Sequence, residues 1–281
     1  MKLFLSSNIT DNRANDELGG NEFIIETVSS ESTENLMKAS EKAENIILKA
    51  GLPKWLVAIE WLAFLVGISL VGGLMDALSG EEAVTLAHAY NKAPLLFWIA
   101  AACLATWLVI FIYGYKKKAE VMRSEEIKSA EENVGTVLDM IKEELDIPEN
   151  AVKVDILSCS YRIKNGDIKI KDDLFINFEF SLYTEGGRLV LADTESKYAI
   201  DLDKFTAITP VDGTVYLASW NKEEPIKSEK YREYRLREDK IGLVVTKRYY
   251  IVEFTSDDEL YGICIPNYEL PVIESLIGRR V

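Results

Sequence analysis

Histidine is nearly absent from this sequence of 281 residues, in which His88 is the only one. Catalytic triads and zinc sites that depend on histidine therefore have no candidate outside that position. The glycine patterns of nucleotide-binding loops are absent as well, and so is the Gly-x-Ser-x-Gly turn of α/β hydrolases. We expect no cofactor and no catalytic centre, and an enzyme of unrecognised type is the least favoured alternative.

Two acidic clusters, Asp172-Asp173 and Asp257-Asp258-Glu259, are the remaining candidates for metal ligation. Carboxylates suit divalent cations, but both clusters fall in predicted turns, where a solvated loop is the better interpretation. We therefore predict no metal site. His88 is interpreted in the same way as an exposed loop residue, with pH sensing as the alternative.

Positive charge is scarce, since 32 lysines and arginines face 46 aspartates and glutamates and the formal net charge is −14. A protein whose main partner is nucleic acid needs a basic footprint, so we predict no nucleic-acid partner. Cysteine is scarce too, and the three cysteines make no spacing pattern. This excludes a disulfide-rich scaffold and favours free thiols in a reducing compartment.

Two long apolar runs are present, at residues 55–75 and 94–115. The first has one charge, Glu60, in 21 residues, and the second has none in 22. Because a helix rises about 1.5 Å per residue, each run reaches about 30 Å, the thickness of the hydrocarbon core of a bilayer. We predict a transmembrane hairpin over residues 53–115 with an outer loop at 76–93. The alternative is two buried helices of a soluble bundle.

Lysine and arginine lie mainly outside the predicted hairpin, since Lys92 is the only one in its connecting loop. The basic residues that flank the spans are Lys38, Lys42, Lys49, Lys54, Lys116, Lys117, Lys118, Arg123 and Lys128. The positive-inside rule then places both termini in the cytoplasm. No cleavable signal peptide is apparent, so the first span is expected to start translocation itself. We predict a multi-pass protein, integral to a plasma membrane of the bacterial inner-membrane type.

Glu60 lies about 7 Å into the first span along the helix axis. We expect its carboxylate to reach the cytoplasmic interface or to meet Lys116–Lys118, and a functional intramembrane charge is the alternative. Small residues on both spans allow close helix packing; they are Gly67, Gly72, Gly73, Ala100, Ala101, Ala102 and Ala105. This packing is expected to serve the hairpin itself, with a homo-oligomer as the alternative.

The segments beside the hairpin differ in pattern. Residues 1–30 are polar and are predicted to be disordered. Residues 31–51 carry an apolar stripe at helical spacing and are predicted to form a cytoplasmic amphipathic helix. The second span is predicted to continue without a break into a juxtamembrane helix at residues 116–147, ended by Pro148. The two helices are expected to pair as an antiparallel stalk, unless either packs on the C-terminal domain.

Over residues 149–281 the hydrophobic pattern changes from the helical period to the alternation of strands. Ile176, Phe178 and Phe180, for example, alternate with polar residues as in a half-buried strand. Seven or eight such strands with turns at close intervals predict a cytoplasmic antiparallel β-sandwich or small barrel. A short helix at residues 270–277 follows them. The predicted fold class is therefore membrane α+β.

A family pattern is carried by three stretches of this region: SKYAIDLDKFTAI, TVYLASW and ELYGICIPNYELPVIESLIG. They resemble the pleckstrin-homology-like (PH-like) domains of bacterial membrane proteins. In that family the closing strand ends in Ile-Pro, as at Ile265-Pro266 here, and leads into the last helix. The resemblance implies seven strands closed by one helix, and a binding or scaffolding module. It assigns no site residues.

The clearest local charge feature is residues 222–248, which hold nine lysines and arginines against six acids, with interleaved tyrosines. The favoured interpretation is a strand pair whose outer face carries solvated mixed charge. The alternative is a basic hairpin that faces an anionic leaflet, where each favourably placed cation contributes about 1 kcal/mol. The candidate residues for contact with lipid or a partner are Lys230, Arg232, Arg235, Arg237, Lys247 and Arg248.

Together these patterns favour a non-enzymatic, membrane-anchored binding or scaffolding module. It is expected to present a cytoplasmic PH-like domain to a protein partner or to lipid headgroups. The alternative from a different class is an oligomeric subunit of a membrane sensor or transport assembly.

Overall fold

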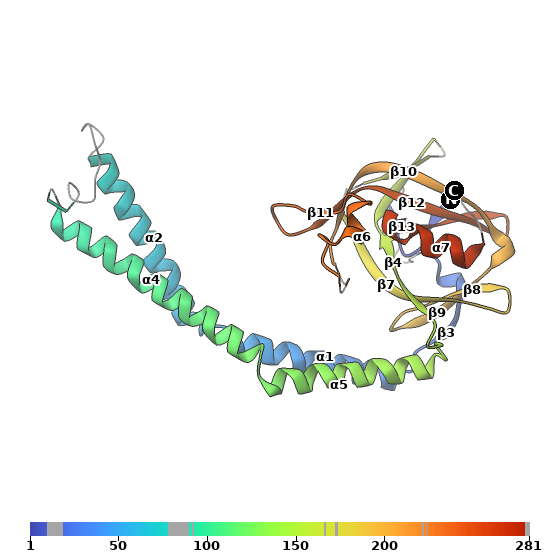
Figure 1. The fold of residues 1–281 in the computed structure, drawn as a ribbon, viewed down its shortest axis with the longest axis horizontal. Coiled ribbons are helices and arrows are strands. Elements are labelled where there is room, and N and C mark those ends of the chain that lie inside the picture. Colours follow the sequence, from blue (N-terminus) through green and yellow to red (C-terminus); the bar gives the residue numbers. More distant parts are fainter. Residues whose placement is uncertain are drawn as a thin grey trace. The chain divides into compact units, whose positions relative to one another are not determined.

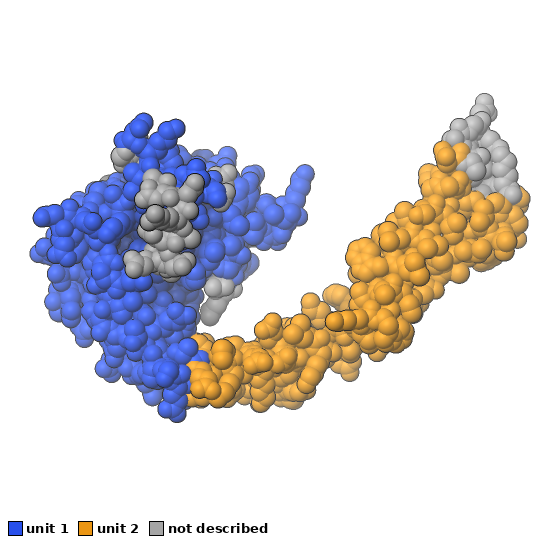
Figure 2. All heavy atoms as spheres, turned by 180° about the vertical axis from the view of Figure 1, so that it is seen from behind, with its two compact units in different colours: residues 1–33, 139–281 blue, residues 34–138 orange. Residues whose placement is uncertain are grey.

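The computed structural model divides the chain into two compact units (Figures 1 and 2). Residues 34–138 form one, called here the helical unit, and residues 1–33 and 139–281 form the other, called the β-unit. The structure describes residues 1–9, 19–77, 90–91, 93–165, 167–171, 174–220, 222 and 224–278.

Two helices of the helical unit are long and apolar enough to cross a membrane, which confirms this part of the prediction. Helix α2 spans Lys54–Ala77 and helix α4 spans Pro94–Val121. Only 11% of the apolar window of each helix is buried inside the structure, unlike the core helices of a soluble bundle. Pro94 starts α4 at a position where the missing N–H costs nothing.

Helices α2 and α4 pack against each other at a glycine. A Cβ atom at Gly67 would lie 2.8 Å from the Leu104 side chain, so any larger residue there would force Leu104 to shift. The rings of Phe64 and Trp107 lie 5.1 Å apart in the same hairpin. At Gly72 a Cβ atom would meet no described atom within 4 Å. Gly67 therefore serves the hairpin, and Gly72 takes no part in this contact.

Helices α1, Ser30–Ala50, and α5, Glu125–Glu144, pack on each other within the helical unit. Ile46 near the end of α1 is buried against Ile127 and Ala130 near the start of α5. This contact is the one expected for an antiparallel stalk, since each helix covers part of the apolar stripe of the other.

The helix that follows the second apolar run is interrupted. Helix α4 ends at Val121 and α5 begins at Glu125, so the predicted unbroken helix through residues 116–147 is wrong at residues 122–124. Ser124 supplies the physical reason, because its Oγ accepts a hydrogen bond of 3.4 Å from the Ile127 N–H and caps a new helix.

The β-unit holds a ten-stranded mixed sheet and a three-stranded sheet. Neighbours along the larger sheet are β1 (Lys2–Leu3), β13 (Glu259–Pro266), β12 (Val244–Ser256), β10 (Phe205–Leu217), β7 (Leu174–Glu185), β8 (Arg188–Ala192), β9 (Ser196–Asp201) and β3 (Ile24–Thr27). Off this path, β11 (Arg237–Glu238) pairs with β12, and β4 (Val152–Ser158) pairs with β7 and β13. The smaller sheet consists of β2 (Ser7–Asn8), β5 (Ser160–Lys164) and β6 (Asp167–Ile170). The helices of this unit are α6 (Glu229–Arg232) and α7 (Leu270–Ile277).

Five strands form a closed cycle of pairings, in the order β4, β7, β10, β12, β13 and back to β4. The closing contact joins Leu157 of β4 to Cys264 of β13. Strands β7 and β10 are parallel, and so are β1 with β13 and β2 with β5. The prediction of a wholly antiparallel sheet is therefore wrong, because these pairs join segments distant in sequence rather than hairpin neighbours.

Alternate residues of the central strands enter two apolar cores, one on each face of the sheet. On β12, Val252 and Phe254 belong to the first core and Ile251 belongs to the second. Helix α7 contributes Ile273 and Ile277 to the first core. Because both faces are covered there, β12 and β13 lack the polar outer face of a half-exposed sheet over most of their length, whereas β7 and β10 keep exposed residues.

The N-terminal segment is part of the β-unit. Strand β1 pairs with β13, and β3 pairs with β9. Phe4 is fully buried, and its ring lies 5.2 Å from that of Tyr198. The predicted disorder of residues 1–30 is therefore wrong for residues 1–9 and 19–30.

Burial of the apolar residues 3–5 provides the free energy that orders this polar segment. The compact β-unit consequently contains more of the chain than the predicted domain of residues 149–281. The remainder of the predicted disordered segment, residues 10–18, lies outside the described residues.

Candidate anion-binding pocket

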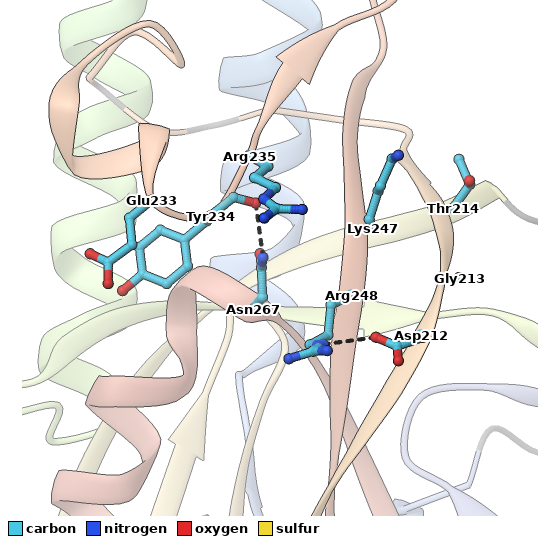
Figure 3. A pocket seen from close by; sticks show the side chains of 9 residues that line it. All are labelled: Asp212, Gly213, Thr214, Glu233, Tyr234, Arg235, Lys247, Arg248 and Asn267. Carbon is cyan, nitrogen blue, oxygen red and sulfur yellow. Dashed lines mark hydrogen bonds and ion pairs between the residues drawn. The ribbon is translucent and has the colours of Figure 1, made fainter.

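An open pocket of about 640 Å³ lies on the β-unit where strands β10 and β12 meet the segment after α6 (Figure 3). Its lining residues are Asp212, Gly213, Thr214, Glu233, Tyr234, Arg235, Lys247, Arg248 and Asn267. Three of them are cations that the sequence assigned to a basic hairpin. The fold therefore gathers one half of the predicted candidate residues at a single place.

One wall of the pocket is an irregular part of β10. The sequence Pro210-Val211-Asp212-Gly213 is typical of a turn, but β10 is one strand whose register with β12 shifts between Asp212 and Val215. Asp212 lies opposite Arg248, and the Arg248 Nε donates a hydrogen bond of 2.8 Å to its carboxylate. This hydrogen bond raises the pKa of the Arg248 guanidinium.

The opposite wall is the segment that follows α6, where the sequence predicted a strand. Tyr231 of α6 is buried, with its ring 5.3 Å from Trp220 and 5.7 Å from Tyr268. A single buried aromatic anchor therefore fixes this segment, whereas a strand would present alternating residues to the core. The predicted strand pair is accordingly wrong for residues 224–236, whereas Arg237–Glu238 of β11 do pair antiparallel with β12.

Asn267 joins the two walls at the bottom of the pocket. Its Nδ2 donates a hydrogen bond of 3.0 Å to the Tyr234 carbonyl, and its Oδ1 accepts one of 3.1 Å from Thr246 Oγ1. Arg235, the next residue, has a left-handed backbone with φ of 58°. Such a conformation is costly for a residue with a Cβ, so the hydrogen bonds around Asn267 hold Arg235 in place.

The cations of the pocket are unequally neutralised. Arg248 is paired with Asp212. Among the described residues no ion pair joins Arg235 or Lys247 to an acid, although Glu233 also lines the pocket. Two exposed cations are therefore available on a scaffold fixed by strands and hydrogen bonds, an arrangement that suits a phosphate or carboxylate group.

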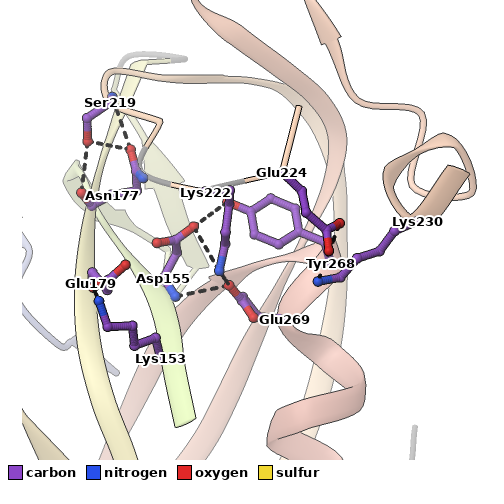
Figure 4. A network of polar contacts seen from close by, with 10 residues as sticks. All are labelled: Lys153, Asp155, Asn177, Glu179, Ser219, Lys222, Glu224, Lys230, Tyr268 and Glu269. Carbon is purple, nitrogen blue, oxygen red and sulfur yellow. Dashed lines mark hydrogen bonds and ion pairs between the residues drawn. The ribbon is translucent and has the colours of Figure 1, made fainter. Parts of the chain in front are cut away.

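A buried network beneath the neighbouring loop supports this side of the β-unit (Figure 4). The Lys222 ammonium forms ion pairs with the carboxylates of Glu269 and Asp155, the second at 3.6 Å. Asp155 is completely buried. The Tyr268 hydroxyl donates a hydrogen bond of 2.7 Å to Asp155. Ser219, at the start of the same loop, bonds to Asn177 through its hydroxyl at 2.8 Å. The loop before α6 is thus tied down at two points.

Burial is the main cause of the pKa shifts in this network. It raises the pKa of the Glu269 carboxyl, although the Lys222 ammonium opposes the change. Burial lowers the pKa of Lys222, but Glu269 and Asp155 outweigh it and the net shift is upward. Burial and the Asp155 charge raise the pKa of Tyr268 far above its ordinary value. The network is therefore arranged to keep Lys222 charged.

The other predicted basic residues lie outside the pocket. Lys230 is 3.9 Å from Glu224, and Arg232 is 3.9 Å from Glu229, all on exposed side chains. Arg237 is exposed on β11. Sequence reasoning missed Asn267, which follows the Ile-Pro end of β13 and carries no charge signal. It also missed the buried partners of Lys222, because they lie far away along the chain.

Glu60 lies on the half-buried face of α2, seven residues and about two turns from Gly67. No ion pair among the described residues joins Glu60 to Lys116–Lys118. The Lys117 Nζ instead donates hydrogen bonds of 3.3 and 3.0 Å to the carbonyls of residues 49 and 51. These bonds satisfy carbonyl groups at the C-terminal end of α1.

Among the described residues no group of three or more metal-ligating side chains is present. Asp257 and Asp258 form the left-handed turn between β12 and β13, as the prediction of a turn requires. His88, Asp172-Asp173 and most of the predicted outer loop lie outside the described residues.

Two observations therefore define the candidate site: the pocket with its free cations and the buried network that fixes the adjoining loop. Comparisons with family models, with curated proteins and with solved structures found no match to this chain.

Proposed function

We propose that the chain is a non-enzymatic, membrane-anchored binding module that takes anionic lipid headgroups at the pocket of the β-unit. In this proposal α2 and α4 span the membrane as a hairpin, and both termini lie in the cytoplasm. The β-unit then works beside the leaflet in which anionic lipids give a negative surface potential. The PH-like character of the domain is part of the proposal, supported by the closed cycle of five strands and the terminal helix α7.

The availability of Arg235 and Lys247 carries the proposal. Lys230 and Arg232, on the same segment of the chain, each have an acid within 4 Å. Arg235 and Lys247 line one pocket and have no such partner among the described residues. A headgroup phosphate supplies the missing negative charge, and Arg235 can bind it through two parallel hydrogen bonds.

The full-length protein, kept in a neutral detergent, provides the test. Titration with glycerol 1-phosphate, followed by calorimetry, is expected to show one site whose affinity falls as salt is added. The double substitution Arg235→Glu and Lys247→Glu is expected to weaken binding by at least about tenfold, because two charge-assisted hydrogen bonds are lost.

Lys204→Glu is the matched control, since it changes charge on an exposed residue that precedes β10, eight residues before Asp212, and that is absent from the lining of the pocket. It is expected to bind glycerol 1-phosphate as the wild type does. Equal binding by the double variant, or no binding by the wild type, would refute the headgroup proposal. A protein partner would then become the better candidate.

A further inference from the structure

The turn between β11 and β12 is closed by one carboxylate. The Asp239 side chain accepts hydrogen bonds of 2.9 Å from the N–H groups of Ile241 and Leu243. Its own N–H donates to the Leu243 carbonyl at 3.0 Å. Gly242 supplies the positive φ, 86°, that the turn requires. This internal bonding fixes the turn without help from the core, and Figure 1 shows the loop extending from the sheet.

Ile241 lies at the tip of this turn with 79% of its surface exposed, more than any other large apolar residue that the structure describes. No local packing explains an isoleucine there, since turn tips favour glycine, asparagine and aspartate. A single exposed apolar residue is ordinary on a protein surface. Here, however, the residue is held outward by a rigid turn, which points to a contact made with another body.

Cations surround the base of the same turn. Arg237 and Lys240 flank the tip, and Arg235 and Lys247 of the pocket lie on the adjoining segments. All four are exposed, and none has an ion-pair partner within the described part of the chain. Residues 235–248 hold five cations against two acids, Glu238 and Asp239, so the apolar tip belongs to a segment of net positive charge. This combination matches the interface of an anionic bilayer, where acyl chains lie beneath charged headgroups.

We propose that Ile241 inserts into the headgroup and acyl boundary of an anionic leaflet while the pocket beside it holds a headgroup. This inference rests on the proposed function and adds to it the residue that would enter the bilayer beside the pocket. The bilayer is preferred as the occupant because its charge is opposite to the net charge of +3 of residues 235–248 and because the chain itself carries two helices apolar enough to enter it. Insertion buries the one apolar side chain that the turn exposes.

The test uses the full-length protein in lipid nanodiscs, with a polarity-sensitive fluorophore attached to Ile241→Cys. The wild type, labelled in the same way, gives the background of the native cysteines, of which Cys159 and Cys264 are buried. We expect a blue shift, and protection from aqueous iodide, in discs that contain phosphatidylglycerol. Discs of phosphatidylcholine alone are expected to leave the fluorophore exposed, because the cations then find no opposite charge.

Ile25→Cys is the matched control, because Ile25 is also exposed and apolar but lies on β3, away from the basic residues in sequence. It is expected to report water in both kinds of disc. A fluorophore at Ile241 that stays equally accessible to iodide in both lipids would overturn the inference.

A second variant separates this inference from the function on which it rests. Ile241→Ser leaves the pocket residues unchanged and is expected to bind glycerol 1-phosphate normally. Binding of glycerol 1-phosphate without burial of the fluorophore would refute insertion and leave the pocket intact. Burial of the fluorophore by a protein that binds no glycerol 1-phosphate would refute the pocket and support insertion alone.

Discussion

At the scale of single residues, the basic side chains of residues 222–248 separate into two kinds. Lys222 is held by two buried carboxylates, whereas Arg235 and Lys247 stand exposed in the pocket. A buried ion pair that loses one partner leaves an uncompensated charge, which is far more costly than the loss of a surface pair. Identical charges in one segment therefore have different roles, one structural and the others available for binding.

Lys222→Met tests the structural role. It removes the cation between Asp155 and Glu269 and is expected to lower the free energy of unfolding by about 3 kcal/mol at neutral pH. Urea unfolding of the full-length protein in detergent, followed by tryptophan fluorescence in a variant whose other four tryptophans are replaced by phenylalanine, measures the change. Trp220 suits this purpose because it packs against Tyr268 in the same region. Lys204→Met, which removes an exposed charge, is the control and is expected to be neutral.

The same variant has a defined pH dependence. Burial already raises the pKa of Glu269, and loss of the Lys222 ammonium removes what opposes that shift. A carboxyl with a raised pKa in the folded state favours folding below its unfolded pKa and disfavours it as the pH rises. The loss of unfolding free energy caused by Lys222→Met should therefore become smaller as the pH falls from 7 towards 5. In the wild type, the raised pKa of Lys222 keeps its stabilising charge until strongly alkaline pH. A deficit that is independent of pH would contradict this account.

At the scale of elements, the N-terminal segment is a structural part of the β-unit. Phe4→Ala is expected to cost about 3–5 kcal/mol of unfolding free energy, since the ring is fully buried against Tyr198 and Phe180. Phe178→Ala is the matched control, because Phe178 is 45% exposed on β7 and should cost less than about 1 kcal/mol. Urea unfolding measures both, and equal losses would show that the N-terminal segment does not stabilise the sheet.

The sequence predicts elements where one local signal dominates. The two apolar runs foretell α2 and α4, and the alternation of residues 174–183 foretells that β7 is a strand. The expected faces are wrong at the start of β7, however, since Ile176 and Phe178 are exposed and Asn177 is buried, because tertiary packing decides which face is covered. The interruption at residues 122–124 is harder to predict, since a single serine cap competes there with a continuous helical pattern. The parallel pairs and the closing contact of Leu157 with Cys264 depend on distant segments, so no local period reports them.

The pocket also combines features that a local sequence signal predicts with features that depend on distant segments. Charge composition identifies Arg235, Lys247 and Arg248 as candidates, but it cannot distinguish them from Lys230 and Arg232. Their separation depends on the register shift in β10 and on the buried anchor of α6, both of which arise from tertiary packing. The residues that shape a site are for this reason less visible in sequence than the charges that line it.

At the scale of the whole molecule, the two units differ in the apolar surface that they expose to solvent. The helical unit exposes two apolar helices that water solvates poorly, and the β-unit buries its own cores on both faces of the sheet. A protein built in this way is expected to be extracted from membranes only by detergent. Its β-unit is expected to retain its fold in that detergent, because no described core residue depends on lipid contact.

Topology is the prediction on which the proposed function depends most. Lysine and arginine concentrate outside the hairpin, so both ends of the chain, and with them the pocket, should lie on the cytoplasmic side. In intact cells, Ile25→Cys on β3 should be protected from an impermeant thiol reagent, and Tyr90→Cys, near the start of α4, should react. Permeabilised cells provide the control, since both positions are exposed in the structure and should then react equally. Labelling of Ile25→Cys from outside would place the β-unit, and the pocket with it, against the wrong leaflet. The headgroup proposal would then fail for a reason independent of the chemistry of the pocket, because the anionic lipids that attract its cations lie on the cytoplasmic face.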